Sequence, residues 1–100
     1  MPIVCNLEPL SATQHVRHAD LIGRLRADVV KVTDLPDGYV YELAGGGISL
    51  PELAEWIALE SLCCPFLTFQ LEVAQTHPTR LALRGPEGVK AILRQEFPEK

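Results

Sequence analysis

Residues 59–71 read LESLCCPFLTFQL, and this stretch joins a helix to a strand. Pro65 disfavours helical backbone at the residue before it, so the helix that contains Glu60 is predicted to end near Cys63. From Phe66 to Val73 apolar and polar residues alternate, which is typical of a half-buried antiparallel strand. A helix that gives way directly to an amphipathic strand indicates an α+β protein.

Two capping boxes and several turn signals predict the remaining elements. Ser11 with Gln14, and Ser49 with Glu52, have the spacing that begins a helix. The first helix is expected to run to about Val30 or Lys31. Strands are expected at 39–43, 66–73 and 80–84, with a short additional strand at 3–7 and a final helix over 89–97. The predicted order is therefore (β)-α-β-α-β-β-α.

The length and composition fit one domain that spans residues 1–100. We expect a two-layer α+β fold in which helices cover an antiparallel sheet of three or four strands. No apolar run reaches the roughly 18 residues of a membrane span, and the N-terminus lacks a secretory pattern. A net charge of −4 disfavours nucleic-acid binding, which needs a basic surface. The expected location is cytoplasmic, with neither membrane nor nucleic acid as a partner.

The chain has three cysteines, which are Cys5, Cys63 and Cys64. An odd number, with two cysteines adjacent, gives no regular disulfide framework, so reduced thiols in a reducing compartment are expected. The sequence has no C-x-x-C pair and no recognised hydrolase or metalloprotease motif. These absences favour a protein that is not an enzyme, and a small enzyme with a cysteine nucleophile ranks last among the interpretations.

Glu60 is the unusual residue of the second helix. Leu53, Trp56 and Ile57 lie on its apolar stripe, and helical geometry places Glu60 near the centre of that stripe. A buried carboxylate has to be paired, protonated or bound to a cation. The end of the helix also carries partial negative charge, which further disfavours an acid there. The sequence therefore predicts a positive partner for Glu60.

Three kinds of partner remain open. Arg80 or Arg84 from the neighbouring hairpin could pair with Glu60. His18, which lies near the middle of the apolar stripe of the first helix, could share a proton with it. A metal ion could also bind there, and the donor types suit zinc, copper(I) or mercury. The candidate metal ligands are Glu60, Cys63, Cys64 and His18.

The competing interpretation is a structural or protein-interaction domain that has no bound metal and no catalysis. Cys63 and Cys64 then pack as small apolar side chains, as free cysteines commonly do. Leu59 and Leu62 fall on the outer face of the predicted helix and suggest an interface of a homo-oligomer.

The pattern W-x-x-x-E-x-x-C-C-P-F-x-x-F, from Trp56 to Phe69, resembles a group of small bacterial proteins of unknown function. A later stretch, Gly85–Lys90, is shared with the same group, so the resemblance covers about residues 49–97. We associate the group with metal-stress contexts. The resemblance carries no established activity, but it implies a metal or thiol role for Glu60, Cys63 and Cys64.

Overall fold

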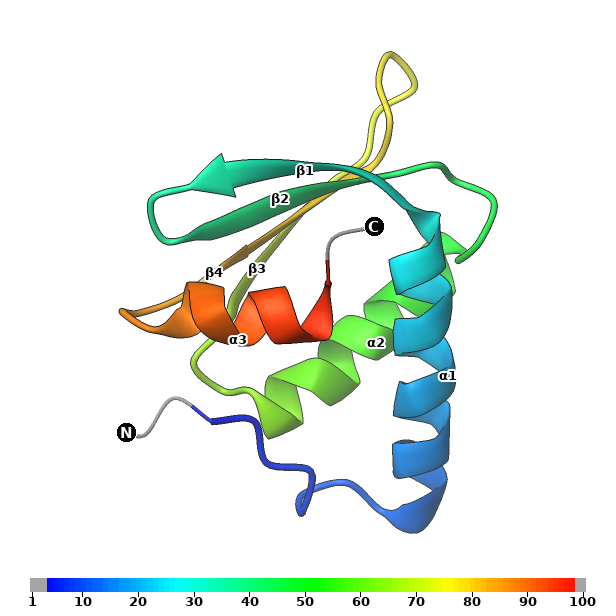
Figure 1. Ribbon diagram of the computed structural model, residues 1–100. Helices are drawn as coiled ribbons and strands as arrows, with labels where there is room; N and C mark the ends of the chain where they lie inside the picture. The colour runs from blue at the N-terminus through cyan, green and yellow to red at the C-terminus, as the bar shows by residue number, and fades with distance from the viewer. Residues whose placement is uncertain (1–3, 99–100) are drawn as a thin grey trace.

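The computed structural model describes residues 4–98 and confirms the α+β fold class. The elements are α1 (Ala12–Asp28), β1 (Val29–Leu35), β2 (Gly38–Leu43), α2 (Leu50–Cys63), β3 (Thr68–Glu72), β4 (Arg80–Arg84) and α3 (Val89–Glu96). The helices gather on one face of a four-stranded sheet (Figure 1). Both predicted capping boxes form, at Ser11 and at Ser49.

The sheet is antiparallel throughout, and its strands lie in the order β1-β2-β4-β3. The central pair is β2 with β4, in which Tyr41 lies opposite Leu81 and Tyr39 opposite Leu83. Leu81 and Leu83 of β4 are fully buried and belong to the core. Strand β3, which follows α2 in the chain, pairs with the central strand β4, so the end of α2 is held next to the core.

Strand β1 was not predicted. The sequence pattern extended the first helix to Val30 or Lys31, but α1 ends at Asp28, and Val29 already has extended backbone. The segment that follows is rich in β-branched valines, which favour strands, and its backbone pairs with β2. The two strands meet at Leu35 and Gly38, where a side chain on Gly38 would collide with the backbone of Leu83.

Residues 4–7 form an irregular segment, here called the N-terminal arm, rather than the short strand expected at 3–7. Residues 4–7 have no strand structure, and Ile3 lies outside the described residues. The Asn6 backbone N–H donates a hydrogen bond to the Cys63 carbonyl oxygen at 2.8 Å. Leu10, next to the start of α1, is buried in the core. The arm is therefore anchored to the end of α2.

The core extends further around α2 than the sequence pattern indicated. Trp56 is fully buried and meets the rings of Phe69 and Phe97 edge-on, with centroids 6.1 Å apart in both cases. Leu59, expected on the outer face, is buried, whereas Leu62 is exposed as predicted. Leu59 belongs to the core cluster, and α1 packs along α2 in addition to the contact of Trp56 with Phe69 of the sheet.

Two apolar residues of the strand predicted at 66–73, which the alternation would place on the buried side, are instead exposed. Leu71 and Val73 have 40% and 53% of their surface accessible. Strand β3 is an edge strand that pairs only with β4 in the described part of the chain, so the helices do not cover its far end. Among residues 4–98, no helix has the length and apolar character needed to cross a membrane.

Candidate functional site

Six side chains from separate parts of the chain meet inside the helical layer. We call this group the buried cluster, and it consists of Cys5, His18, Glu60, Cys63, Cys64 and Glu96. Cys5 comes from the N-terminal arm, His18 from α1 and Glu96 from α3. The other three residues, Glu60, Cys63 and Cys64, come from the end of α2 and its C-cap. The fold thus gathers thiol, imidazole and carboxyl groups from the whole length of the domain.

The partner of Glu60 is His18. The Nε2 atom of His18 lies 2.9 Å from Oε1 of Glu60, whose side chain is fully buried, and 14% of the His18 side chain remains accessible. The alternative arginine partners are wrong. Arg80 contacts Glu72 at the sheet surface, and Arg84 pairs with Asp37. Arginines on the sheet cannot serve the buried acid because both point away from the helical layer.

Cys63 contributes a neutral thiol to the same oxygen of Glu60. Its Sγ donates a hydrogen bond to Glu60 Oε1 at 3.3 Å. Burial, and then the negative charge of Glu60, raise the pKa of the Cys63 thiol to about 12. One oxygen of Glu60 therefore receives hydrogen bonds from a histidine ring and from a thiol.

Cys5 and Cys64 form a disulfide, so the expectation of reduced thiols is wrong for this pair. The two residues are 59 positions apart in the sequence, and their Cα atoms lie 4.7 Å apart. Cys63 remains a free, buried thiol. Sequence spacing did not predict the bond because the arm and the end of α2 come together only in the folded chain.

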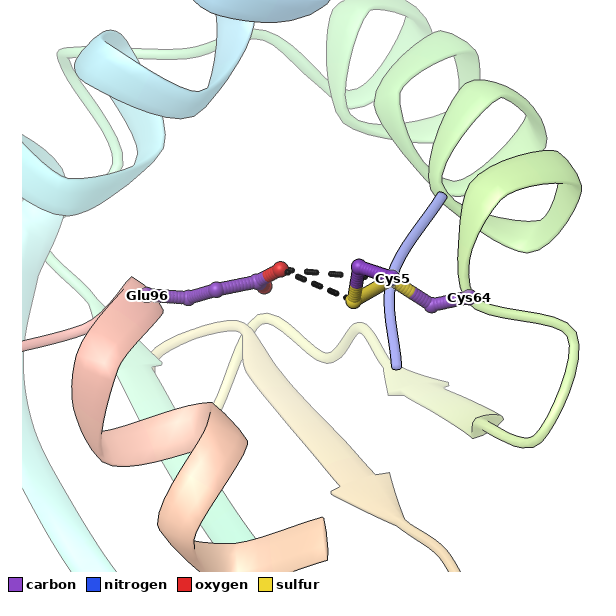
Figure 2. Close-up of side chains that lie close together, drawn as sticks. All are labelled: Cys5, Cys64 and Glu96. Carbon is purple, nitrogen blue, oxygen red and sulfur yellow. Dashed lines mark hydrogen bonds between the residues drawn. A yellow bond between two sulfur atoms is a disulfide. The ribbon is translucent and has the colours of Figure 1, made fainter. Parts of the chain in front are cut away.

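Glu96 completes the cluster and was missed in the sequence. Its Oε1 lies 3.4 Å from Sγ of Cys5 and 3.9 Å from Sγ of Cys64. Figure 2 shows the Glu96 side chain extending from α3 toward the disulfide. Burial, and then the proximity of Glu60, raise the pKa of Glu96 to about 9. Since disulfide sulfurs carry no hydrogen, a proton in these contacts has to belong to Glu96.

The carboxyl groups of Glu60 and Glu96 lie close enough to influence each other's ionisation. The Oε2 atom of each carboxyl group is buried without a hydrogen-bond partner among the described residues. Burial alone favours the neutral form of Glu60, but the hydrogen bond from His18, the neighbouring carboxyl group of Glu96 and the hydrogen bond from Cys63 lower its pKa below the usual value. One proton shared between the two acids, held mainly on Glu96, satisfies this arrangement.

The cluster divides into two sets of potential metal ligands. His18, Glu60 and Cys63 form the first set, and their ligand atoms all lie within 4.8 Å of one another. The second set consists of Cys5, Cys64 and Glu96, whose ligand atoms also lie within 4.8 Å of one another. Three of the four predicted ligands therefore come together, while Cys64 belongs to the other set.

A signal for Glu96 was present in the sequence. Val89, Leu93 and Glu96 follow one another at the i, i+4 and i+7 spacing of a single helical face, and the first two are buried. The reasoning that singled out Glu60 on an apolar stripe applies equally to Glu96. A signal for Cys5 was absent, because nothing in the spacing of the cysteines relates the arm to α2.

No family model, curated protein or solved structure matches this chain. The resemblance of the Trp56–Phe69 pattern to small bacterial proteins therefore stays a prediction, and the function has to be argued from the buried cluster itself.

Proposed function

We propose that this protein binds a thiophilic metal ion through His18, Glu60 and Cys63. The observation that supports the proposal is the convergence of an imidazole nitrogen, a carboxylate oxygen and a thiol sulfur within 4.8 Å in the protein interior. These three donors are the ligand types found at zinc sites, and the thiol extends the range to copper(I) and mercury(II).

The present contacts resemble a site in which hydrogen bonds take the place of metal–ligand bonds. Zinc bonds of about 2.0–2.3 Å in tetrahedral geometry separate neighbouring ligand atoms by roughly 3.3–3.6 Å. Glu60 Oε1 lies 2.9 Å from His18 Nε2 and 3.3 Å from Cys63 Sγ. The two distances from Glu60 are therefore close to the spacing that an ion bound by these donors requires.

A cation also removes the electrostatic cost of the buried carboxylate. Glu60 is fully buried at the C-terminal end of α2, whose last turn carries no basic residue. An ion can reach the site from the side of His18, because His18 is the partly exposed member of the set. Binding displaces the Cys63 proton, so the affinity for the ion should increase with pH.

The proposal is tested by titrating zinc into purified protein in which the Cys5–Cys64 disulfide is intact and one thiol per chain is counted. Competition with a chromophoric chelator gives stoichiometry and affinity. We expect one ion per chain, with uptake abolished in Cys63→Ser and weakened at least 10-fold in His18→Ala. His15→Ala is the matched control, since His15 is exposed on the same helix. Copper(I) and mercury(II) titrations then rank the ions.

Absence of stoichiometric uptake of all three ions, or equal uptake by wild type and Cys63→Ser, would overturn the proposal. The second candidate function, an oligomerising domain, then gains support. The observation in its favour is Val30 and Val32, which are 64% and 47% exposed on the edge strand β1. Sedimentation velocity tests it, because Val32→Lys should dissociate an oligomer that forms at this edge.

A further inference from the structure

We propose a second metal site, at Cys5, Cys64 and Glu96, which opens when the disulfide is reduced. In the oxidised protein the two sulfurs are bonded to each other and cannot act as thiolate ligands. Reduction turns them into two thiols that face a carboxyl group, which is a ligand set for zinc, cadmium or copper(I). This inference goes beyond the proposed function, because it uses different residues and depends on redox state.

The geometry of the second set does not depend on the disulfide alone. The hydrogen bond from the Asn6 N–H to the Cys63 carbonyl holds the residue that follows Cys5 against the residue that precedes Cys64. A second contact, between the His15 ring and the Leu7 carbonyl oxygen at 2.7 Å, ties the arm to α1. After reduction, Cys5 is therefore still held near Cys64.

The two sulfurs differ in their accessibility to solvent, and this difference decides which of them a reductant attacks. Cys5 is half-buried, whereas Cys64 is fully buried. A thiolate of a dithiol reductant attacks Cys5 Sγ, the S–S bond breaks, and Cys64 leaves as a thiolate that takes up a proton. The second thiol of the reductant then displaces Cys5, which also becomes a thiol, and the reductant departs as its own disulfide.

Glu96 supplies the third ligand. Its Oε1 already lies 3.4 Å from Cys5 Sγ and 3.9 Å from Cys64 Sγ (Figure 2), and its Oε2 is buried without a hydrogen-bond partner among the described residues. All ligand atoms of this set lie within 4.8 Å of one another. When an ion binds the two thiolates, it takes the place of the Glu96 proton that lies between the carboxyl group and the two sulfurs in the oxidised protein.

The test uses the Cys63→Ser variant, which lacks the thiol of the first site and keeps the disulfide pair. Protein reduced with a phosphine and desalted without oxygen is titrated with cadmium(II), whose thiolate complexes absorb in the ultraviolet. We expect one cadmium ion per reduced chain with absorption from two thiolates, and no thiolate absorption in the oxidised chain. Adding Glu96→Gln should weaken uptake at least 10-fold, while adding Glu87→Gln, at an exposed position, should leave it unchanged.

Equal cadmium uptake by oxidised and reduced Cys63→Ser would overturn the inference. Equal affinities of the Glu96→Gln and Glu87→Gln variants would also overturn it. Two cysteines of an unfolded chain would bind cadmium without help from Glu96 and would give this result. The zinc titration of the oxidised wild-type protein reports on the first site alone. The two proposals can therefore fail separately.

Discussion

Glu60 of α2 and Glu96 of α3 lie close together in the protein interior, and each carboxyl group shifts the pKa of the other. Two ionised carboxylates this close would repel, so one of them has to hold a proton. His18 contacts Glu60, and the disulfide contacts Glu96, so the environment makes the two acids unequal. The interior therefore contains one charged acid that prefers a cation and one neutral acid that can donate its proton.

The raised pKa of Glu96 makes stability depend on pH. The pKa rises from its ordinary value of 4.5 to about 9 on folding, so between these pH values the folded chain holds a proton that the unfolded chain has lost. The free energy of unfolding should therefore fall as pH increases through this range, with a slope of up to about 1.4 kcal/mol per pH unit from this group. Urea unfolding of the metal-free protein at a series of pH values measures the slope.

Glu96→Gln should remove that part of the slope and raise the stability at pH 8 relative to wild type. Glu87→Gln, at an exposed position, is the control and should keep the wild-type profile. A Glu96→Gln profile parallel to that of the wild type between the two pKa values would show that Glu96 ionises normally in the folded protein.

Removing the negative charge of Glu60 should weaken metal binding. Loss of a supporting hydrogen bond near a metal typically reduces affinity about 10–100-fold, and Glu60→Gln removes a proposed ligand, so we expect at least that loss for zinc. Glu55→Gln is the matched control, because Glu55 lies on the same helix and pairs at the surface with Arg17. Chelator competition measures both variants, and equal affinities would exclude Glu60 as a ligand.

Asp28 should contribute strongly to the stability of the loop before α2. It is buried at the end of α1, and its carboxylate accepts hydrogen bonds from the backbone N–H groups of Gly45 and Gly47. Hydrogen bonds to charged groups are worth about 1.5–3 kcal/mol, so Asp28→Ala should lower the free energy of unfolding by about that amount. Asp20→Ala, on the exposed side of the same helix, should change it by less than about 0.5 kcal/mol.

The two leucines near the end of α2 should differ in their effect on stability. Leu59 is buried and Leu62 is 48% exposed. Truncating a buried leucine to alanine typically costs about 2–5 kcal/mol, and we expect Leu59→Ala to lie at the lower end of this range. Leu62→Ala should cost well under about 1 kcal/mol. Chemical denaturation compares them, and similar losses would contradict the packing of α1 along α2.

Local rules were sufficient for most of the fold. The two capping boxes, the helix end before Pro65 and the strand at 80–84 are properties of short segments, and each is formed as predicted. The boundary between α1 and β1 was missed because valines fit an apolar helical stripe as well as a strand. Pairing with β2, a tertiary contact, decides in favour of the strand.

The candidate site was predicted only in part, for a similar reason. Helical periodicity was sufficient to place Glu60 in the interior, and it could also have found Glu96. It could not identify partners, because the contacts of Glu60 with His18 and of Cys64 with Cys5 join segments far apart in the chain. The choice of His18 over the sheet arginines depends on how α1 lies along α2.

The disulfide has a consequence for the order of events during synthesis. Cys5 emerges from the ribosome well before its partner, which lies 59 residues later and directly follows another cysteine. The thiol of Cys5 therefore becomes able to meet the thiols of Cys63 and Cys64 at nearly the same time. Cys63 ends α2 with its sulfur hydrogen-bonded to Glu60, whereas Cys64 has left the helical conformation. In the folded chain the end of the helix therefore places the sulfur of Cys64 against Cys5 and keeps the sulfur of Cys63 on Glu60.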